Sequence, residues 1–168
     1  MKVLRLLIGS ISMHMIFVGN PGTGKTTIAR IVAKYLKAIG VLSSGHLCEV
    51  TRADLVGQYA GHTAVKTTEV INGAVGGVLF IDEAYSLCRD KNDAFGLEAI
   101  DALVKGMEDN RDDLVVILAG YEDEMQEFLK ANSGLKSRFP NVVRFEDYSV
   151  DEMCAIANVT AASKGYKI

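Results

Sequence analysis

The chain has 168 residues, of which 49% are hydrophobic, 21 are acidic and 18 are basic, so its formal net charge is −3. This length and hydrophobic content suit one globular domain, or one domain and part of another, and exclude a disordered chain. The negative charge argues against bulk electrostatic binding to nucleic acid, and no apolar run approaches the ~18 residues of a transmembrane helix.

The first residues, Met1–Ile8, carry two positive charges and an apolar stretch, a combination that faintly resembles a signal peptide. However, Arg5 interrupts the apolar run and no small-x-small cleavage site follows it. We therefore favour a truncated or frayed edge of the domain over a signal peptide.

Short apolar runs predict five β-strands, at His14–Val18, Leu47–Thr51, Gly77–Asp82, Leu114–Ala119 and Val142–Phe145. These runs are apolar along most of their length and do not alternate with polar residues. This pattern is typical of strands covered on both faces, as in a parallel sheet.

Helical patterns separate the predicted strands. Apolar residues recur at helical steps from Ile28 to Ile39, from Leu97 to Met107 and, more briefly, from Met125 to Leu129. Ser149 and Glu152 form a capping-box pattern that predicts the start of a further helix. Alternating strands and helices indicate an α/β fold built from right-handed βαβ crossovers.

An uninterrupted phosphate-loop pattern, G-x-x-x-x-G-K-[ST], lies between the first predicted strand and the first predicted helix. Glycines allow backbone N–H groups to surround phosphate oxygens, and the start of a helix adds the positive end of its dipole. In this pattern Lys25 reaches the β- and γ-phosphates, and the Thr26 hydroxyl binds Mg²⁺. The residues expected to bind the nucleotide here are Gly19, Asn20, Pro21, Gly22, Thr23, Gly24, Lys25, Thr26 and Thr27.

Two carboxylates, Asp82 and Glu83, end the third predicted strand after the apolar residues 78–81. The carboxyl edge of a parallel sheet is where α/β proteins bind ligands. We expect Asp82 to hold Mg²⁺ through its waters and Glu83 to act as the general base on the attacking water. The alternative is that both carboxylates only cap the helix that follows.

Taken together, these segments resemble the AAA+ ATPases, and within them the branch of red-type Rubisco activases (CbbX) and stage V sporulation protein K. The resemblance covers about Met13 to Ile168 and includes MIFVGNPGTGKTTIAR, GGVLFIDEAYSL and GLKSRF. It implies a P-loop NTPase fold with a five-stranded parallel sheet in the order 5-1-4-3-2. It also divides the chain into a nucleotide-binding α/β subdomain, residues 1–148, and the first helix of a truncated helical lid, residues 149–168.

The resemblance also assigns residues that act beyond the phosphate loop. Tyr59, Ala60 and Gly61 match a pore loop, in which an aromatic ring grips an extended polypeptide; the small Ala60 departs from the larger aliphatic residue common there. Arg138 matches the arginine finger that reaches a neighbour's site, with Arg144 as a weaker rival expected to pair with a carboxylate at the sheet edge. The alternatives are a Tyr packed in an ordinary loop and a surface Arg that caps a helix.

Tyr121 stands at the sensor position that follows the fourth predicted strand, where its hydroxyl would orient water. Asp123 and Glu124 are alternatives for this role. The sequence equally allows Tyr121 to pack under the loop.

The resemblance implies an ATP-driven protein remodeller that assembles into a ring, a hexamer in the parent protein, and threads protein substrates through a central pore. ATP and Mg²⁺ are the expected cofactors. The second reading is a nucleotide-binding scaffold with little turnover, because the lid is truncated and the sensor is unusual. The third, a clamp or helicase loader, needs basic loops that this chain lacks.

The three cysteines lie far apart and form no Cys-x-x-Cys pair, which argues against disulfide scaffolds and four-ligand zinc sites. We therefore expect a reducing compartment, either the cytoplasm or an organelle stroma or matrix, with no membrane partner.

Overall fold

The computed structural model describes residues 12–165, so the signal-peptide-like segment Met1–Ile8 lies outside the described residues. The elements are β1 (Met15–Val18), α2 (Lys25–Ala38), β2 (Leu47–Val50), α3 (Arg52–Leu55), α4 (His62–Ala74), β3 (Val78–Ile81), the 3₁₀ helix η1 (Ala84–Leu87), α5 (Ala94–Asp109), β4 (Val115–Gly120), α6 (Glu122–Ala131), α7 (Ser133–Lys136), β5 (Asn141–Arg144) and α8 (Val150–Ser163). Each predicted strand is confirmed to within one residue at either end.

The five strands form one sheet in the order β2-β3-β4-β1-β5, and every neighbouring pair is parallel. Read from the other edge, this is the predicted order 5-1-4-3-2. Met15 of β1 is aligned with Ile117 of β4 on one side and with Asn141 of β5 on the other. The carboxyl ends of all five strands therefore lie along the same edge of the sheet.

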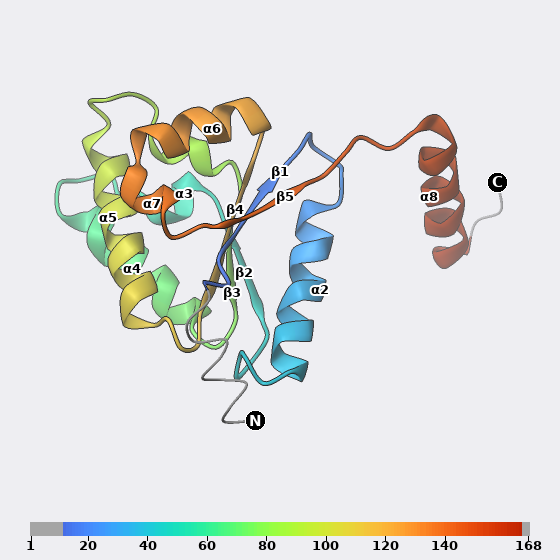
Figure 1. Cartoon of the computed structure of the whole chain (residues 1–168), viewed down its shortest axis with the longest axis horizontal. Coiled ribbons are helices and arrows are strands. Elements are labelled where there is room, and N and C mark those ends of the chain that lie inside the picture. The colour runs from blue at the N-terminus through green and yellow to red at the C-terminus, as the bar shows by residue number, and fades with distance from the viewer. Residues whose placement is uncertain (1–11, 166–168) are drawn as a thin grey trace.

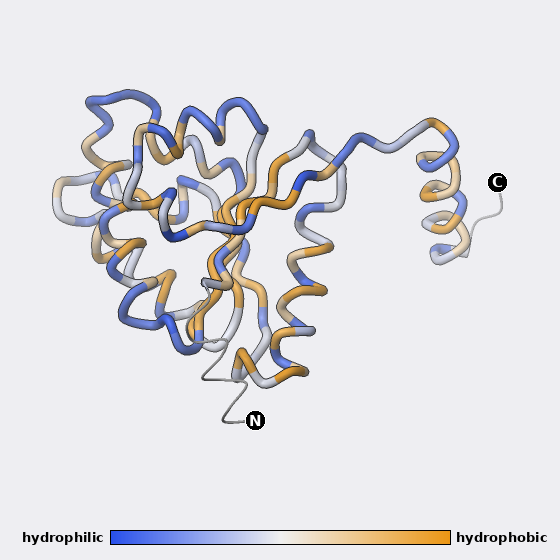
Figure 2. Tube along the Cα trace, in the orientation of Figure 1, coloured by the Kyte–Doolittle hydropathy of each residue, from blue (hydrophilic) through white to orange (hydrophobic). Residues whose placement is uncertain are grey.

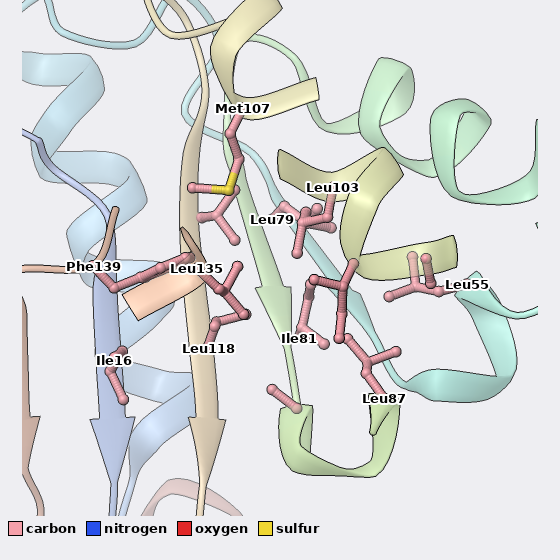
Figure 3. Close-up of a cluster of buried hydrophobic side chains, with 14 of the residues drawn as sticks. Ile16, Leu55, Leu79, Ile81, Leu87, Leu103, Met107, Leu118, Leu135 and Phe139 are labelled. Carbon is pink, nitrogen blue, oxygen red and sulfur yellow. The ribbon is translucent and has the colours of Figure 1, made fainter. Parts of the chain in front are cut away.

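Helices cover both faces of the sheet, α2 on one and α4 to α7 on the other (Figure 1). Successive residues of β1 point to opposite faces, so Phe17 packs beneath Ala33 of α2 while Ile16 belongs to the core on the other face. Figure 3 shows this second, larger core, in which Leu79 and Leu118 meet residues of α5 and α7. Burial on both faces explains why the central strands are apolar throughout.

The prediction that the strands are buried on both faces is correct for the central strands β3 and β4 and wrong for β5. All residues of β3 and β4 are buried, whereas all four residues of β5 are exposed. Val142 and Val143 of β5 retain 46% and 38% of their surface. The reason is that helices do not cover it: β2 is also an edge strand, but α2, α3 and α4 pack on β2, whereas β5 packs chiefly against β1. Hydrophobic residues accordingly concentrate in the centre of the molecule (Figure 2).

The last helix, α8, begins where the capping-box pattern predicts. The Ser149 hydroxyl oxygen accepts from the Glu152 backbone N–H at 3.2 Å, and the Glu152 carboxylate accepts from the Ser149 N–H at 2.7 Å. None of the residues of α8 is buried, and the helix lies apart from the sheet (Figure 1). No helix in residues 12–165 has the length and apolar character needed to cross a membrane.

Candidate active site

The phosphate-loop segment connects β1 to α2 through glycines whose backbone other residues rarely adopt. Gly22 and Gly24 have φ angles of 75° and 91°, and Gly24 immediately precedes α2. At Gly19, an added Cβ would lie 2.6 Å from the carbonyl oxygen of Phe145. These glycines therefore allow both the tight turn and the close approach of the segment after β5.

Lys25 is the first residue of α2 and folds back over the loop. Its Nζ donates to the carbonyl oxygens of Gly19 and Asn20, both at 2.8 Å. Burial lowers the pKa of Lys25, and the nearby Asp82 carboxylate partly opposes that shift. The ammonium group and the amino end of a 14-residue helix thus face the same place, which favours an anion there.

Residues after β5 support the loop from outside. The Asn20 side-chain amide donates to both carboxylate oxygens of Asp147 at 3.0 Å, and the Tyr148 hydroxyl donates to the Thr23 carbonyl oxygen at 3.0 Å. Thr23 also donates its hydroxyl to the Asn20 carbonyl oxygen at 2.7 Å. Sequence analysis missed Asp147 and Tyr148, since no local pattern connects them to a loop more than 120 residues away.

The paired carboxylates lie where β3 ends. The Asp82 carboxylate accepts from the Glu83 backbone N–H at 3.0 Å. Glu83 has a φ of 49°, the one positive value among non-glycine residues in the described part of the chain. Its side chain makes no capping hydrogen bond to η1, which gives no support to the reading that it only caps a helix. Such strained residues concentrate at functional sites.

A cavity of about 410 Å³ at the carboxyl edge of the sheet brings these groups together. Its lining residues are Gly19, Pro21, Gly22, Gly24, Lys25, Thr26, Thr27, Asp82, Glu83, Tyr85, Gly120 and Tyr121. Of the residues predicted to bind nucleotide, only Asn20 and Thr23 are outside this lining, and both shape the loop by hydrogen bonds instead. The Thr26 hydroxyl and the Asp82 carboxylate are hard oxygen donors, which fit Mg²⁺.

Two tyrosines close one side of the cavity. The ring centroids of Tyr121, which follows β4, and Tyr85 of η1 are 6.0 Å apart. Gly120 makes room for them, because an added Cβ there would lie 2.8 Å from the Tyr85 ring. Burial, followed by the charge of Glu83, raises the pKa of Tyr85. Sequence analysis missed Tyr85, although its position two residues after Glu83 was an available signal.

Arg138 does not line this cavity. Its Nε donates to a carboxylate oxygen of Glu108 at 3.1 Å and its Nη1 to the carbonyl oxygen of Gly134 at 2.7 Å. The rival arginine, Arg144, pairs with Glu122 at 2.8 Å, the kind of contact predicted for it at the sheet edge.

The predicted pore-loop residues Tyr59, Ala60 and Gly61 lie together on the surface, outside the cavity lining. The Tyr59 side chain keeps 66% of its surface exposed, so it is not packed into the domain. Its ring contacts only the edge of the His62 ring among the aromatic neighbours in residues 12–165, with centroids 5.6 Å apart.

Comparisons with known proteins agree with this geometry. The chain is 53% identical over 163 residues to stage V sporulation protein K of Bacillus subtilis, covering 97% of this chain and 51% of that protein. It is 53% identical over 158 residues to protein CbbX of Cereibacter sphaeroides, covering 94% and 51%. Identity to a chloroplastic ribulose bisphosphate carboxylase/oxygenase activase of Cyanidioschyzon merolae is 54%, covering 94% and 52%. The chain thus spans about half the length of these relatives.

A solved structure shares the fold. The AAA domain of FIGL-1 in complex with ADP matches with a TM-score of 0.66 over 90% of this chain and 49% of that chain, at 21% identity. The profile of the ATPase family associated with various cellular activities (AAA) matches residues 15–147, which include every strand and the whole cavity lining. The chain therefore belongs to the AAA ATPase family.

Proposed function

We propose that the cavity binds ATP with Mg²⁺ and that the chain hydrolyses the γ-phosphate. The observation that carries this proposal is the convergence in one cavity of the phosphate loop, Lys25, Thr26 and the Asp82–Glu83 pair, which come from the carboxyl ends of β1 and β3. Family membership supports the same chemistry.

Lys25 and the amino end of α2 bind and orient the β- and γ-phosphates by their positive charge. To do so, the Lys25 ammonium exchanges its two backbone carbonyl partners for phosphate oxygens. The Thr26 hydroxyl would hold Mg²⁺ and Asp82 would hold it through its waters; when bound, the ion would neutralise charge on the phosphates.

Glu83 is proposed as the general base. It lines the cavity beyond Asp82, and its left-handed backbone aims the side chain differently from a regular continuation of β3. Tyr121 is proposed to orient the attacking water through its hydroxyl, since it lines the same cavity at the end of β4.

The remaining proposed roles require a second copy of the chain. We propose that Arg138 acts as an arginine finger in the cavity of a neighbouring subunit, because it lies outside the cavity of its own chain.

The assembly would be a ring, a hexamer in the parent protein, in which exposed Tyr59, Ala60 and Gly61 grip a protein substrate. Residues 149–168, with α8, would be the first helix of its lid. The name Rubisco activase, given to relatives, supports a protein substrate. The proposed compartment is the cytoplasm or an organelle stroma or matrix.

The deciding experiment is steady-state ATP turnover with Mg²⁺ over a range of protein concentrations, beside Glu83→Gln. We expect turnover per chain to rise with concentration and the variant to bind ATP without hydrolysing it. Glu127→Gln is the matched control, because that side chain is 78% exposed on α6 and should not change turnover. Turnover by Glu83→Gln at the parent rate would remove Glu83 as the base. Bound ATP with flat, negligible turnover would favour the nucleotide-binding scaffold.

A further inference from the structure

One partly buried ion pair joins α3 to the start of α5, beside η1, whose Tyr85 lines the cavity. Nη1 and Nη2 of Arg52, the first residue of α3, donate to the Asp93 carboxylate, at 2.5 and 2.9 Å. The two side chains are only 15% and 8% exposed. In every other ion pair within residues 12–165, both side chains are at least 31% exposed.

The pair contacts the segment that follows the proposed base. Arg52 also donates to the carbonyl oxygen of Ser86 at 2.7 Å, and Ser86 lies in η1, which begins immediately after Glu83. Asp93 in turn caps α5 by accepting from the Gly96 N–H at 3.0 Å. The fixed fork of a guanidinium makes this contact directional, so Arg52 ties α3 to both η1 and the start of α5.

On its other side, α3 leads directly into the loop that carries Tyr59. The start of this loop is fastened to α4, since the Gly57 N–H donates to the Thr63 hydroxyl at 2.9 Å and Lys66 donates to the Val56 carbonyl oxygen at 3.1 Å. The Thr67 hydroxyl donates a hydrogen bond to the Leu55 carbonyl oxygen at 2.9 Å. These contacts join the start of the loop to α3 and α4, so a shift of α3 would be passed to the loop, while the Tyr59 side chain remains exposed.

We propose that Arg52 is a positioning residue that couples the backbone after Glu83 to the loop of Tyr59. The inference rests on the proposed function, because it assumes that nucleotide occupies the cavity beside Glu83. The left-handed backbone of Glu83 sets the direction in which η1 leaves β3. A displacement of η1 on nucleotide binding would pull the Ser86 carbonyl oxygen, and through Arg52 would move α3 and the adjoining loop.

The chain contains no tryptophan, so Tyr59→Trp introduces a single fluorescent reporter at the loop. The experiment measures acrylamide quenching of this indole without nucleotide, with MgADP, and with Mg²⁺ and a non-hydrolysable ATP analogue. We expect the quenching constant to differ among these states when Arg52 is present. We expect that difference to be lost in Tyr59→Trp/Arg52→Lys, which keeps the charge but lacks the fork.

A second variant separates coupling from folding. Tyr59→Trp/Arg52→Gln/Asp93→Asn leaves no unpaired buried charge and should also lose the difference while remaining folded by circular dichroism. The matched control is Tyr59→Trp/Arg30→Gln, since the Arg30 pair with Glu49 is exposed and 3.7 Å long. That control should keep the full difference.

Nucleotide affinity is measured in parallel with a fluorescent ATP analogue. If the folded Arg52 variants keep the same nucleotide-dependent quenching as Tyr59→Trp, the proposed coupling is overturned. An ion pair with a purely structural role predicts that result. Nucleotide binding with no quenching change in Tyr59→Trp itself would overturn it too, and would leave the proposed hydrolysis standing. Absence of nucleotide binding in the parent would overturn both proposals.

Discussion

The cavity at the carboxyl edge of the sheet is built differently from the two sites outside it, at Tyr59 and at Arg138. Cavity groups come from three strand ends of one chain, and hydrogen bonds of 2.7–3.0 Å fix the phosphate loop around them. Tyr59 is 66% exposed, and Arg138 lies outside the cavity lining, where it pairs with Glu108. The residues of one chain therefore form the cavity, whereas the roles proposed for Tyr59 and Arg138 involve a second molecule.

The largest effect is expected for Arg138, and it tests whether this residue acts in the cavity of another chain. In assembled protein, Arg138→Ala should lower ATP turnover by roughly 10³- to 10⁵-fold, the range typical of an arginine finger. The measurement is turnover against protein concentration, with the oligomeric state followed by light scattering.

Arg144→Ala is the matched control for Arg138, because Arg144 pairs with Glu122 and should affect turnover little. An equal loss from Arg138→Ala in a verified monomer would contradict action between subunits and place Arg138 among groups that act within one chain.

Lys25→Ala should weaken ATP binding in every state of assembly, by about 2–5 kcal/mol, because the phosphate charge loses its partner. Isothermal titration calorimetry measures this affinity. Lys34→Ala, an exposed position on the same helix, is the control and should leave affinity unchanged. Unchanged affinity in Lys25→Ala itself would argue against the phosphate-loop assignment.

His14 lies outside the cavity lining and provides a test of the fold. Burial lowers the pKa of His14 from 6.5 to about 4, although Glu108 opposes the shift, and its Nδ1 accepts from the Val116 N–H at 2.9 Å. The unfolded chain therefore binds a proton near pH 6.5 that the folded chain binds only near pH 4. Stability should fall as pH drops through this window, by about 2–3 kcal/mol.

Urea unfolding from pH 7 to pH 4 measures that loss. His14→Asn retains a hydrogen-bond acceptor but does not titrate, so it should reduce the pH dependence of the free energy of unfolding. His62→Asn, at an exposed position, should leave that dependence unchanged. An equally steep loss in His14→Asn would assign the pH dependence to other groups.

The smallest expected effect is at Tyr59. Tyr59→Ala should leave ATP turnover without protein substrate within about twofold, since exposed substitutions change free energies little. Tyr35→Ala, on a tyrosine of α2 that is 62% exposed, is the control. A large loss of basal turnover from Tyr59→Ala alone would show that the loop belongs to the nucleotide site, and would erase the contrast between the two regions.

Much of the fold followed from local patterns. Buried central strands such as β3 and β4 are continuous apolar runs, so their positions matched expectation, whereas the sheet order, which is also confirmed, was implied by the family resemblance. The expectation of burial failed at β5, because an apolar run does not report whether helices cover the strand. In the same way, the phosphate loop is eight contiguous residues, whereas the partners that support it, Asp147 and Tyr148, are distant in sequence.

The sequence by itself therefore determined the α/β class and, through family resemblance, the strand order. It also placed Lys25, Asp82 and Glu83 in the patterns from which their proposed roles follow. Contiguous residues encode these features through spacing and residue type. Only the tertiary structure decided that Tyr85 joins the cavity and that Arg52 and Asp93, 41 residues apart, form a partly buried fork. Such contacts depend on how the ends of strands and the starts of helices are placed in space. A single residue has many possible partners, and its neighbours in sequence do not indicate which of them it contacts.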